Sequence, residues 1–249
     1  MLTTDFLVIG SGPGGSVTAW ELKKSNKNVI MIESGDFFSL DSCQPYSSKE
    51  IEQKYKYGGL NPTINNPKVA YVEGSCVGGG SEVNSGFYHR TPKDIINSWI
   101  ENNQIKDFSY KDLSVHFDII EKEISVSYLP KGVDAAKASY KLMQGAEKIG
   151  WSSMEVPRWY KFDSKNYGTK QSMTETYVKW YLNDGGKLLS NMKAIKIKRS
   201  GKILNIVCFD KINRKNIVIE TKYLFVCGGA ISTPFLLKSS GIKKNIGNT

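Results

Sequence analysis

The feature that most constrains the fold is a strand pattern, a glycine-rich turn and a helix pattern at the start of the chain. Residues 6–9 form a short apolar run, which predicts a buried parallel strand. The turn that follows reads Gly10-Ser11-Gly12-Pro13-Gly14-Gly15. A helix is predicted from Pro13 to about Ser25, and a second strand over residues 28–32 leads to Glu33. Together these elements predict a right-handed βαβ unit.

The spacing of the glycines and of Glu33 indicates a dinucleotide-binding site. Gly10 allows the tight turn out of the strand, Gly12 lets the backbone approach a pyrophosphate, and Gly15 lets the helix pack closely on the strand. The free N–H groups at the start of the helix would attract the phosphates. Glu33 would accept hydrogen bonds from ribose hydroxyls and would repel a 2′-phosphate, which disfavours NADP. A purely structural turn is the alternative, and this motif alone does not distinguish FAD from NAD.

The middle of the chain divides into segments of different character. Residues 36–70 are polar with little periodicity and predict a long excursion over the surface, in which residues 69–72 form a short strand. Helical patterns follow, and they are separated by an irregular, aromatic stretch at residues 151–169. The predicted helices lie near residues 93–102, 110–126, 133–149 and 173–183.

The pattern changes to strands from residue 191 onward. Three runs, at residues 194–198, 203–209 and 216–220, predict a three-stranded meander joined by polar turns. Residues 223–227 predict a further buried strand, which leads into a helix that ends near Ser239. The C-terminal part therefore returns from helices to a sheet.

A second glycine-rich loop occupies residues 74–86. Its three consecutive glycines would expose backbone N–H groups and permit close contact with a flat ring or a phosphate. A mobile surface loop is the alternative reading of such a segment on its own.

Three separated motifs give the chain a resemblance to the glucose-methanol-choline (GMC) oxidoreductases. One is the N-terminal glycine turn, and the second is residues 77–84 followed by Phe87-Tyr88-His89-Arg90, which resembles the signature loop of the family. The third is residues 229–242, which resembles the second family signature. Two positions differ, since Lys243 stands where the family usually has a further glycine and Gly80 where many members have serine.

The resemblance implies non-covalent FAD as the cofactor, because Val83 occupies the place of the histidine that links flavin in some members. The first turn would hold the pyrophosphate and Glu33 the adenosine ribose. The signature loop would lie along the flavin and its ribityl chain, Ala194 would meet the adenine, and the chain would return to the cofactor at residues 229–230. The implied cofactor-binding residues are Gly10, Gly12, Gly14, Gly15, Glu33, Gly78, Gly79, Ser81, Asn84, Ala194, Gly229 and Ala230.

The expected fold class is α/β, a Rossmann-like FAD-binding domain with a three-stranded β-meander and a partial helical cap insert. The first part of the FAD-binding domain would span residues 1–92, the cap 93–172, and the return segment 173–249. The C-terminal substrate domain of the family is expected to be absent.

The implied function is that of an FAD-dependent oxidoreductase, which oxidises the CH–OH group of a small-molecule alcohol by hydride transfer to the flavin. The family's catalytic pair, a histidine with a second histidine or asparagine, lies in a later part of the longer relatives. Neither His89 nor His116 is at that position, so no catalytic residue is assigned, and the truncated chain is expected to be inactive alone. The alternatives are a non-catalytic nucleotide-binding remnant and another FAD enzyme of the same wider fold, which would lack the two later motifs.

Composition excludes several other classes. The net charge of +10 comes from 34 basic and 24 acidic residues, but only four of the basic residues are arginine and the lysines are dispersed, so no nucleic-acid partner is expected. The four cysteines have no metal-like spacing, and two histidines are too few for a histidine-rich metal site. No apolar run is long enough for a membrane span and no signal peptide is evident, so a cytoplasmic location is expected. The electron acceptor and the particular alcohol stay open.

Overall fold

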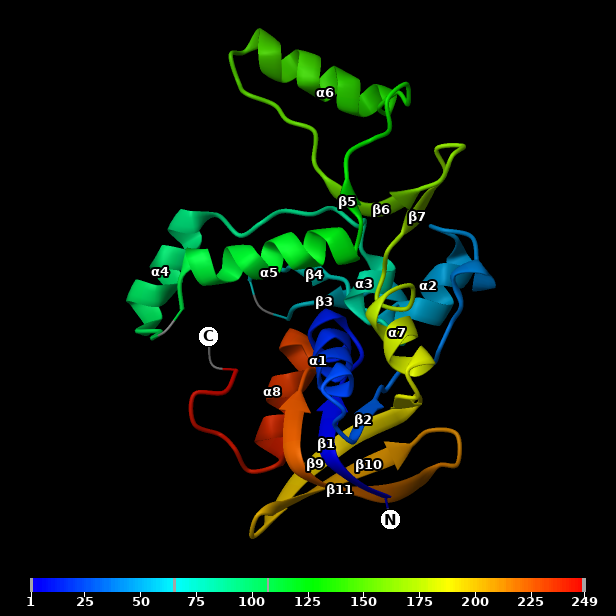
Figure 1. Cartoon of the computed structure of the whole chain (residues 1–249), viewed down its shortest axis with the longest axis vertical. Helices are drawn as coiled ribbons and strands as arrows, with labels where there is room; N and C mark the ends of the chain where they lie inside the picture. The colour runs from blue at the N-terminus through cyan, green and yellow to red at the C-terminus, as the bar shows by residue number, and fades with distance from the viewer. Residues whose placement is uncertain (1, 65, 107, 248–249) are drawn as a thin grey trace. The chain divides into compact units, whose positions relative to one another are not determined.

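The computed structural model describes residues 2–64, 66–106 and 108–247 of the chain. It contains two compact units, one formed by Met1–Asn84 with Ser172–Thr249 and the other by Ser85–Gln171 (Figure 1). The inserted unit therefore begins at residue 85, where the sequence placed the start of the cap at residue 93.

The first unit is built on a six-stranded sheet with the strand order β8-β2-β1-β11-β10-β9. β8, β2, β1 and β11 are parallel to one another, whereas β11, β10 and β9 are antiparallel. The strands are β1 (Leu2–Ile9), β2 (Val29–Ile32), β8 (Lys187–Leu189), β9 (Met192–Ser200), β10 (Ile203–Asp210) and β11 (Lys215–Val226). The α/β class and the meander are thus confirmed, and the meander is continuous with the parallel sheet.

Helices and short elements surround this sheet. The helices of the unit are α1 (Pro13–Lys24), α2 (Ser48–Lys54), α3 (Gly80–Val83), α7 (Tyr177–Asn183) and α8 (Gly229–Ser239). Two 3₁₀ turns, Leu40–Ser42 and Lys56–Gly59, and a small hairpin of β3 (Asn61–Pro62) and β4 (Ala70–Tyr71) complete the unit.

The predicted βαβ unit is present as β1, α1 and β2. Pro13 is the first residue of α1, where its missing N–H costs nothing, and Lys23 and Lys24 lie in the last turn, where the negative end of the helix dipole favours cations. Leu7 and Val8 of β1 are fully buried on opposite faces, as expected for a strand covered on both sides. The local sequence pattern is therefore sufficient to define this unit.

Two layers pack on the two faces of the sheet. On one face, Leu7, Ile206 and Ile219 form a cluster that Leu236 of α8 covers. On the other, α1 packs on β1 and β2 and also on α7, whose buried Tyr181 brings its hydroxyl within 2.9 Å of the Val29 carbonyl. Burial raises the pKa of Tyr181 to about 12, so the phenol stays protonated and available as a donor.

Several elements differ from the sequence expectation. The runs predicted as separate strands at 216–220 and 223–227 form one strand, β11, because Thr221 is buried and its hydroxyl lies 3.0 Å from the Asp5 carbonyl, within the sheet. Residues 36–70 were expected to be irregular but contain α2, and residues 151–169 contain β6 (Arg158–Phe162) and most of β7 (Gly168–Lys170). β8 was also not expected.

The signal for α2 was present in the sequence. Ser47 precedes the helix and its hydroxyl accepts the Glu50 N–H at 3.2 Å, which is the Ser-x-x-Glu start of a capping box. The Glu50 carboxylate in turn accepts the Tyr46 N–H at 2.7 Å.

The second unit consists of helices and a three-stranded sheet of order β5-β6-β7. Its further elements are α4 (Lys93–Asn103), α5 (Tyr110–Glu123), β5 (Val126–Ser127) and α6 (Lys137–Lys148). Arg90 binds Glu121 at 2.5 Å and Asp118 at 2.6 Å on α5, and the Arg90 guanidinium lowers the pKa of the Glu121 carboxyl. These bonds fix the segment after the signature loop to α5.

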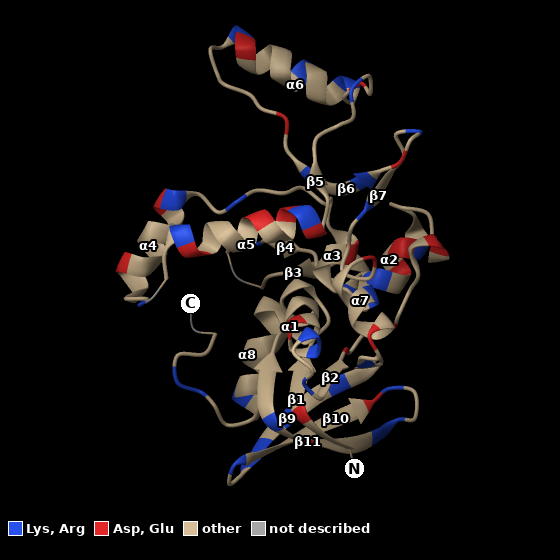
Figure 2. Ribbon diagram, in the orientation of Figure 1, with Lys and Arg blue, Asp and Glu red and all other residues tan. Residues whose placement is uncertain are grey.

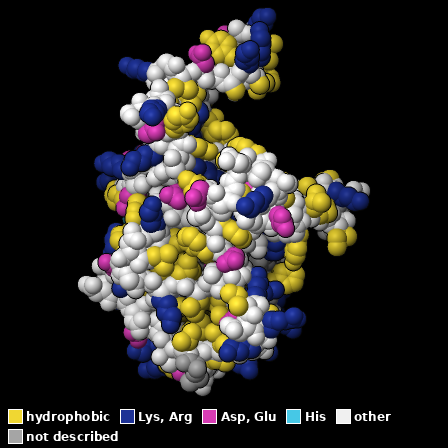
Figure 3. Space-filling model, turned by 90° about the vertical axis from the view of Figure 1, so that its right-hand side faces the viewer, with side chains coloured by type: hydrophobic (Ala, Val, Ile, Leu, Met, Phe, Trp, Pro, Cys, Tyr) yellow, Lys and Arg dark blue, Asp and Glu magenta, His cyan; other side chains and the backbone are white. Residues whose placement is uncertain are grey.

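Charged side chains are distributed over both units. Lys and Arg appear on helices, strands and turns alike, interspersed with Asp and Glu (Figure 2). On the face shown in Figure 3, hydrophobic side chains gather in a patch with Lys and Arg around it. Within the part of the chain that the structure describes, none of the helices is both long and apolar enough to cross a bilayer.

Candidate dinucleotide-binding site

The site lies where β1 and β11 end and three glycine-containing loops meet. Ile9 and Val226 are neighbours at the carboxyl ends of these two parallel strands. The chain leaves β1 through Gly10, whose N–H donates to the Ile32 carbonyl at 2.8 Å, and leaves β11 through Cys227, whose N–H donates to the Ile9 carbonyl at 2.7 Å. Ligands of open α/β sheets bind outside the carboxyl ends of the strands, so this is the expected position for a cofactor.

Gly10 and Gly15 are required by packing within the chain itself. A Cβ on Gly10 would lie 2.3 Å from the Cys227 carbonyl oxygen, and the φ of Gly10 is +95°, which disfavours any other residue. A Cβ on Gly15 would lie 1.8 Å from the Gly10 carbonyl oxygen. These two glycines bring α1 against the end of β1, in agreement with the packing role expected of Gly15.

Gly12 and Gly14 have no such internal reason to be glycine. A Cβ at either position would meet no atom within 4 Å, and the backbone of Gly12, at φ −65°, suits any residue. Gly12 is the N-cap of α1, and among the described residues no side chain caps this helix. The start of α1 therefore offers free N–H groups beside an open backbone surface, which is a cradle for an anionic group such as a pyrophosphate.

Glu33 is held in place by both of its oxygens. Oε2 accepts hydrogen bonds from the N–H and the hydroxyl of Ser11, at 2.9 and 2.8 Å. Oε1 accepts hydrogen bonds from the Gly35 N–H at 2.9 Å and from the Ser34 hydroxyl at 3.1 Å. The side chain is buried, so the carboxylate lies beside the first turn in a fixed orientation.

The start of the meander flanks Glu33. The Met192 N–H donates to the Glu33 carbonyl at 2.8 Å, and Lys211 donates to the Ser34 carbonyl. Burial, together with the charge of Lys193, lowers the pKa of Lys211. Ala194, the predicted adenine contact, lies two residues further along β9 and packs at the edge of the apolar cluster of the sheet.

The signature loop contacts the first turn directly. The Gly78 N–H donates to the Ser11 hydroxyl at 3.1 Å. A Cβ on Gly79 would lie 3.0 Å from the Gly12 Cα, so these two backbones touch. Gly78 and Gly79 therefore lie beside the first turn, so the structure brings these candidate residues together.

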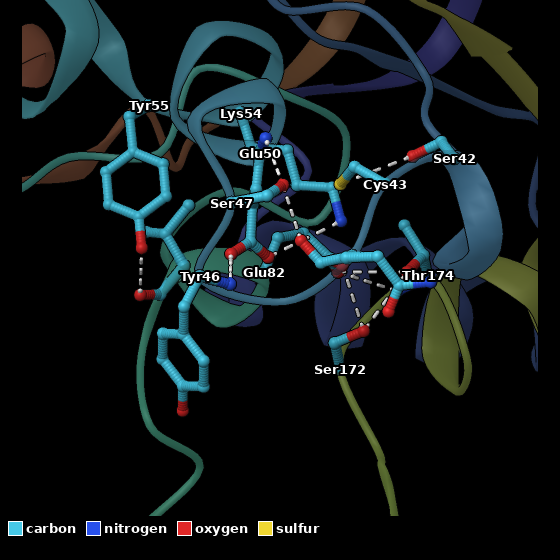
Figure 4. A network of polar contacts seen from close by, with 12 residues as sticks. Ser42, Cys43, Tyr46, Ser47, Glu50, Lys54, Tyr55, Glu82, Ser172 and Thr174 are labelled. Carbon is cyan, nitrogen blue, oxygen red and sulfur yellow. Dashed lines mark hydrogen bonds and ion pairs between the residues drawn. The ribbon is translucent and has the colours of Figure 1, made fainter.

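Ser81 and Glu82 of this loop are buried, and Figure 4 shows Glu82 beside Ser172 and Thr174. The Ser81 hydroxyl donates to the Gly78 carbonyl at 2.7 Å and accepts the Met173 N–H at 3.0 Å. The Glu82 carboxylate accepts the Ser172 hydroxyl at 3.1 Å and the Thr174 hydroxyl at 3.0 Å. The Ser81 side chain is thus used to hold the loop.

Replacing Glu82 with Ala is expected to lower the free energy of unfolding by about 2 to 3 kcal/mol, because the buried Thr174 N–H, now 3.3 Å from the carboxylate, and two hydroxyls lose their acceptor. The measurement is urea denaturation of the purified chain. Glu52→Ala on α2, where the side chain is exposed, is the matched control and should change stability by less than about 0.5 kcal/mol. Equal effects of the two replacements would contradict the anchoring role of Glu82.

The remaining predicted residues lie around the same loops. Asn84 ends α3, and its N–H donates to the Gly80 carbonyl at 3.2 Å. Gly229 and Ala230 are exposed at the start of α8. Lys56 connects α8 to the residue just before the second glycine-rich loop, since its ammonium binds Glu73 at 2.7 Å and the Ser232 hydroxyl at 3.3 Å.

Sequence reasoning missed Ser11, Glu82 and Lys56 as residues of this region. A serine inside a glycine turn and a glutamate inside a signature carry no pattern that separates a buried connector from a surface residue. Their partners in other segments lie 17 to 176 residues away, and such pairs become visible only in the folded chain.

Fold and site together define a dinucleotide-binding α/β protein: a parallel sheet, a glycine turn at a helix N-terminus, and an acid at the end of the second strand. A family model described as GMC oxidoreductase matches residues 5–249. The chain therefore belongs to the GMC oxidoreductase family, and FAD is the cofactor that family membership assigns to it. The resemblance seen in the three motifs is confirmed.

Individual relatives agree with this assignment. The uncharacterised GMC-type oxidoreductase y4nJ of Sinorhizobium fredii is 32% identical over 261 residues, which cover all of this chain and 51% of the relative. Long-chain-alcohol oxidase FAO3 of Arabidopsis thaliana is 29% identical over 264 residues, which cover 98% of this chain and 35% of the relative. The chain thus spans about half the length of the first relative and about a third of the second.

A solved structure supports the fold. An FAD-dependent oxidoreductase from Chaetomium thermophilum matches with a TM-score of 0.75 and 16% sequence identity, covering 96% of this chain and 48% of its own.

Proposed function

We propose that the chain is the FAD-binding part of an oxidoreductase that acts on the CH–OH group of an alcohol. The observation that carries the proposal is the open backbone at Gly12 and Gly14, at the uncapped N-terminus of α1, beside a buried and oriented Glu33. If the turn were purely structural and bound no nucleotide, glycine would not be needed at position 12, because the backbone conformation there suits other residues.

Different residues would bind different parts of the cofactor. Gly12, Gly14 and the start of α1 hold the pyrophosphate, and Glu33 binds the ribose hydroxyls. The loop at Gly78 and Gly79 approaches the flavin, with Asn84 at its end. Ala194 lies on the adenine side, and Gly229 and Ala230 approach the cofactor at the start of α8. Gly10, Gly15 and Ser81 shape these loops from within, since their close contacts are to the protein.

The substrate class follows from the relatives. When bound, FAD would supply the acceptor for a hydride from the carbon that bears the alcohol hydroxyl. Because long-chain-alcohol oxidases match 98% of this chain, a long aliphatic alcohol is the first candidate substrate. Because the chain spans only part of the length of these relatives, we propose that turnover needs residues beyond those assigned here.

Binding and turnover are tested separately. Titration of the purified chain with FAD, followed by quenching of flavin fluorescence, is expected to saturate at one FAD per chain, with ADP competing and 2′-phosphorylated ADP competing poorly because Glu33 repels the phosphate. A chain that shows no saturable binding of FAD would contradict the proposal.

A long aliphatic alcohol, added without oxygen, is expected to leave the flavin of the 249-residue chain oxidised. Reduction of the flavin, seen as loss of its visible absorbance, would show that this chain is catalytic by itself. It would contradict the proposal that turnover needs further residues. FAD binding without reduction by any chain that contains this sequence would favour the alternative of a non-catalytic nucleotide-binding protein.

A further inference from the structure

Ser11 lies at the point where three parts of the site meet. It is fully buried. In the chain it lies between Ile9, which ends β1, and the open positions Gly12 and Gly14. Its neighbours belong to segments far apart in the sequence, Glu33 after β2 and Gly78 in the signature loop.

The hydroxyl of Ser11 is used in both directions. A serine hydroxyl has one hydrogen to donate and lone pairs with which to accept. Here it donates to Oε2 of Glu33 at 2.8 Å and accepts the Gly78 N–H at 3.1 Å. The backbone N–H of Ser11 donates to the same carboxylate oxygen at 2.9 Å. One side chain therefore bonds the carboxylate on one side and the loop on the other.

We propose that Ser11 is a positioning residue: its hydroxyl holds the Glu33 carboxylate and the loop at Gly78 in the relative position that FAD binding requires. This inference rests on the proposed function, in which Glu33 binds the ribose and the loop approaches the flavin. The two groups that would receive the two ends of the cofactor are then both bonded to one buried hydroxyl, in addition to the backbone bond from the Val77 N–H to the Asp36 carbonyl. Such preorganisation raises affinity because less ordering remains to be done on binding.

The structure offers a matched control for Ser11. Ser16 is also fully buried and lies in the first turns of α1, the helix that follows Ser11, but its hydroxyl donates to the Gly12 carbonyl at 2.9 Å, at the start of that helix. Ser11→Ala and Ser16→Ala therefore remove the same atom from the same region. Only the first breaks the connection between Glu33 and Gly78.

The first measurement is hydrogen exchange of the chain without cofactor, which tests the positioning directly. Ser11→Ala is expected to speed exchange of the amides of residues 77–84, because the Gly78 N–H loses its acceptor, while Ser16→Ala leaves that segment unchanged. Equal exchange in the two variants would overturn the inference, whatever the result with FAD.

The second measurement is the affinity for FAD and for ADP. Ser11→Ala is expected to weaken FAD binding about tenfold, as leaving a buried N–H unpaired does, and to weaken ADP binding less, because ADP does not reach the flavin loop. Ser16→Ala should change neither by more than about twofold. An equal loss for both ligands in Ser11→Ala would show that Ser11 acts on Glu33 alone and would overturn the proposed connection.

The two proposals fail in different ways. A wild-type chain that binds no FAD would overturn the proposed function, and hydrogen exchange would then decide by itself whether Ser11 holds the loop. A wild-type chain that binds FAD, with Ser11→Ala equal to wild type in both measurements, would overturn only the role of Ser11.

Discussion

Replacing Gly12 with Val is expected to abolish FAD binding and to leave the chain folded. A Cβ at Gly12 meets no atom of the protein within 4 Å, and φ of −65° is acceptable for valine. The branched side chain would instead fill the space over the start of α1, where the pyrophosphate must approach the backbone. The measurement is the FAD titration, together with the melting temperature of the variant without cofactor.

The control for this replacement is Thr18→Val, which introduces the same side chain on the same helix. Thr18 bonds only the Gly14 carbonyl in the described contacts, at 2.7 Å on the exposed side of α1, so its replacement should leave FAD affinity within about twofold of wild type. Retention of FAD by the Gly12 variant at wild-type affinity would refute a pyrophosphate at this turn and, with it, the assignment of Gly12 and Gly14.

Replacing Gly15 with Ala is expected to have the opposite effect: the chain itself is destabilised, by about 3 kcal/mol or more. The added Cβ would lie 1.8 Å from the Gly10 carbonyl oxygen, and that backbone is fixed by the sheet. To relieve this clash, α1 must move away from β1, and that movement loosens the packing between α1, β1 and α7. The free energy of unfolding from urea denaturation is the measurement.

Gly14→Ala, one residue earlier, is the control for Gly15→Ala. The added Cβ has no neighbour within 4 Å and lies in a helix, so stability should stay the same or rise by up to about 1 kcal/mol. A small cost of Gly15→Ala, similar to that of its neighbour, would show that the helix can shift without loss. The contact to Gly10 would then not be the reason for the glycine.

The sequence predicted most accurately the parts of the fold that depend on local pattern. The limits of α1, Pro13–Lys24, and the βαβ unit follow from an apolar run, a glycine turn and a proline at the first helical position within one stretch of chain. The meander was also predicted, because alternation and turns are local. The division of β11 into two strands was wrong, since Thr221 and Lys222 interrupt the pattern but are accommodated by Asp5 of the neighbouring β1.

The sequence pointed to the glycines and to Glu33 as candidate site residues, and the structure brings their loops together, but the contacts that hold them were not predicted. Gly12 and Gly78 belong to motifs with recognisable spacing, whereas the connections among the loops run through Ser11 and Glu82, whose partners are distant in sequence. Hydrogen bonds of this kind depend on tertiary proximity, which no periodicity reports. Which alcohol is oxidised depends on groups that these motifs do not specify.

The central position of β1 between β2 and β11 has a consequence for synthesis on the ribosome. β1 ends at Ile9, but its partner β11 begins at Lys215, so roughly 200 residues must be made before that edge can pair. In a nascent chain the β1–α1–β2 unit therefore presents an open, apolar strand edge while residues 85–171 emerge and fold. We expect this protein to engage chaperones early, through its N-terminus, and to aggregate when translation is interrupted before β11.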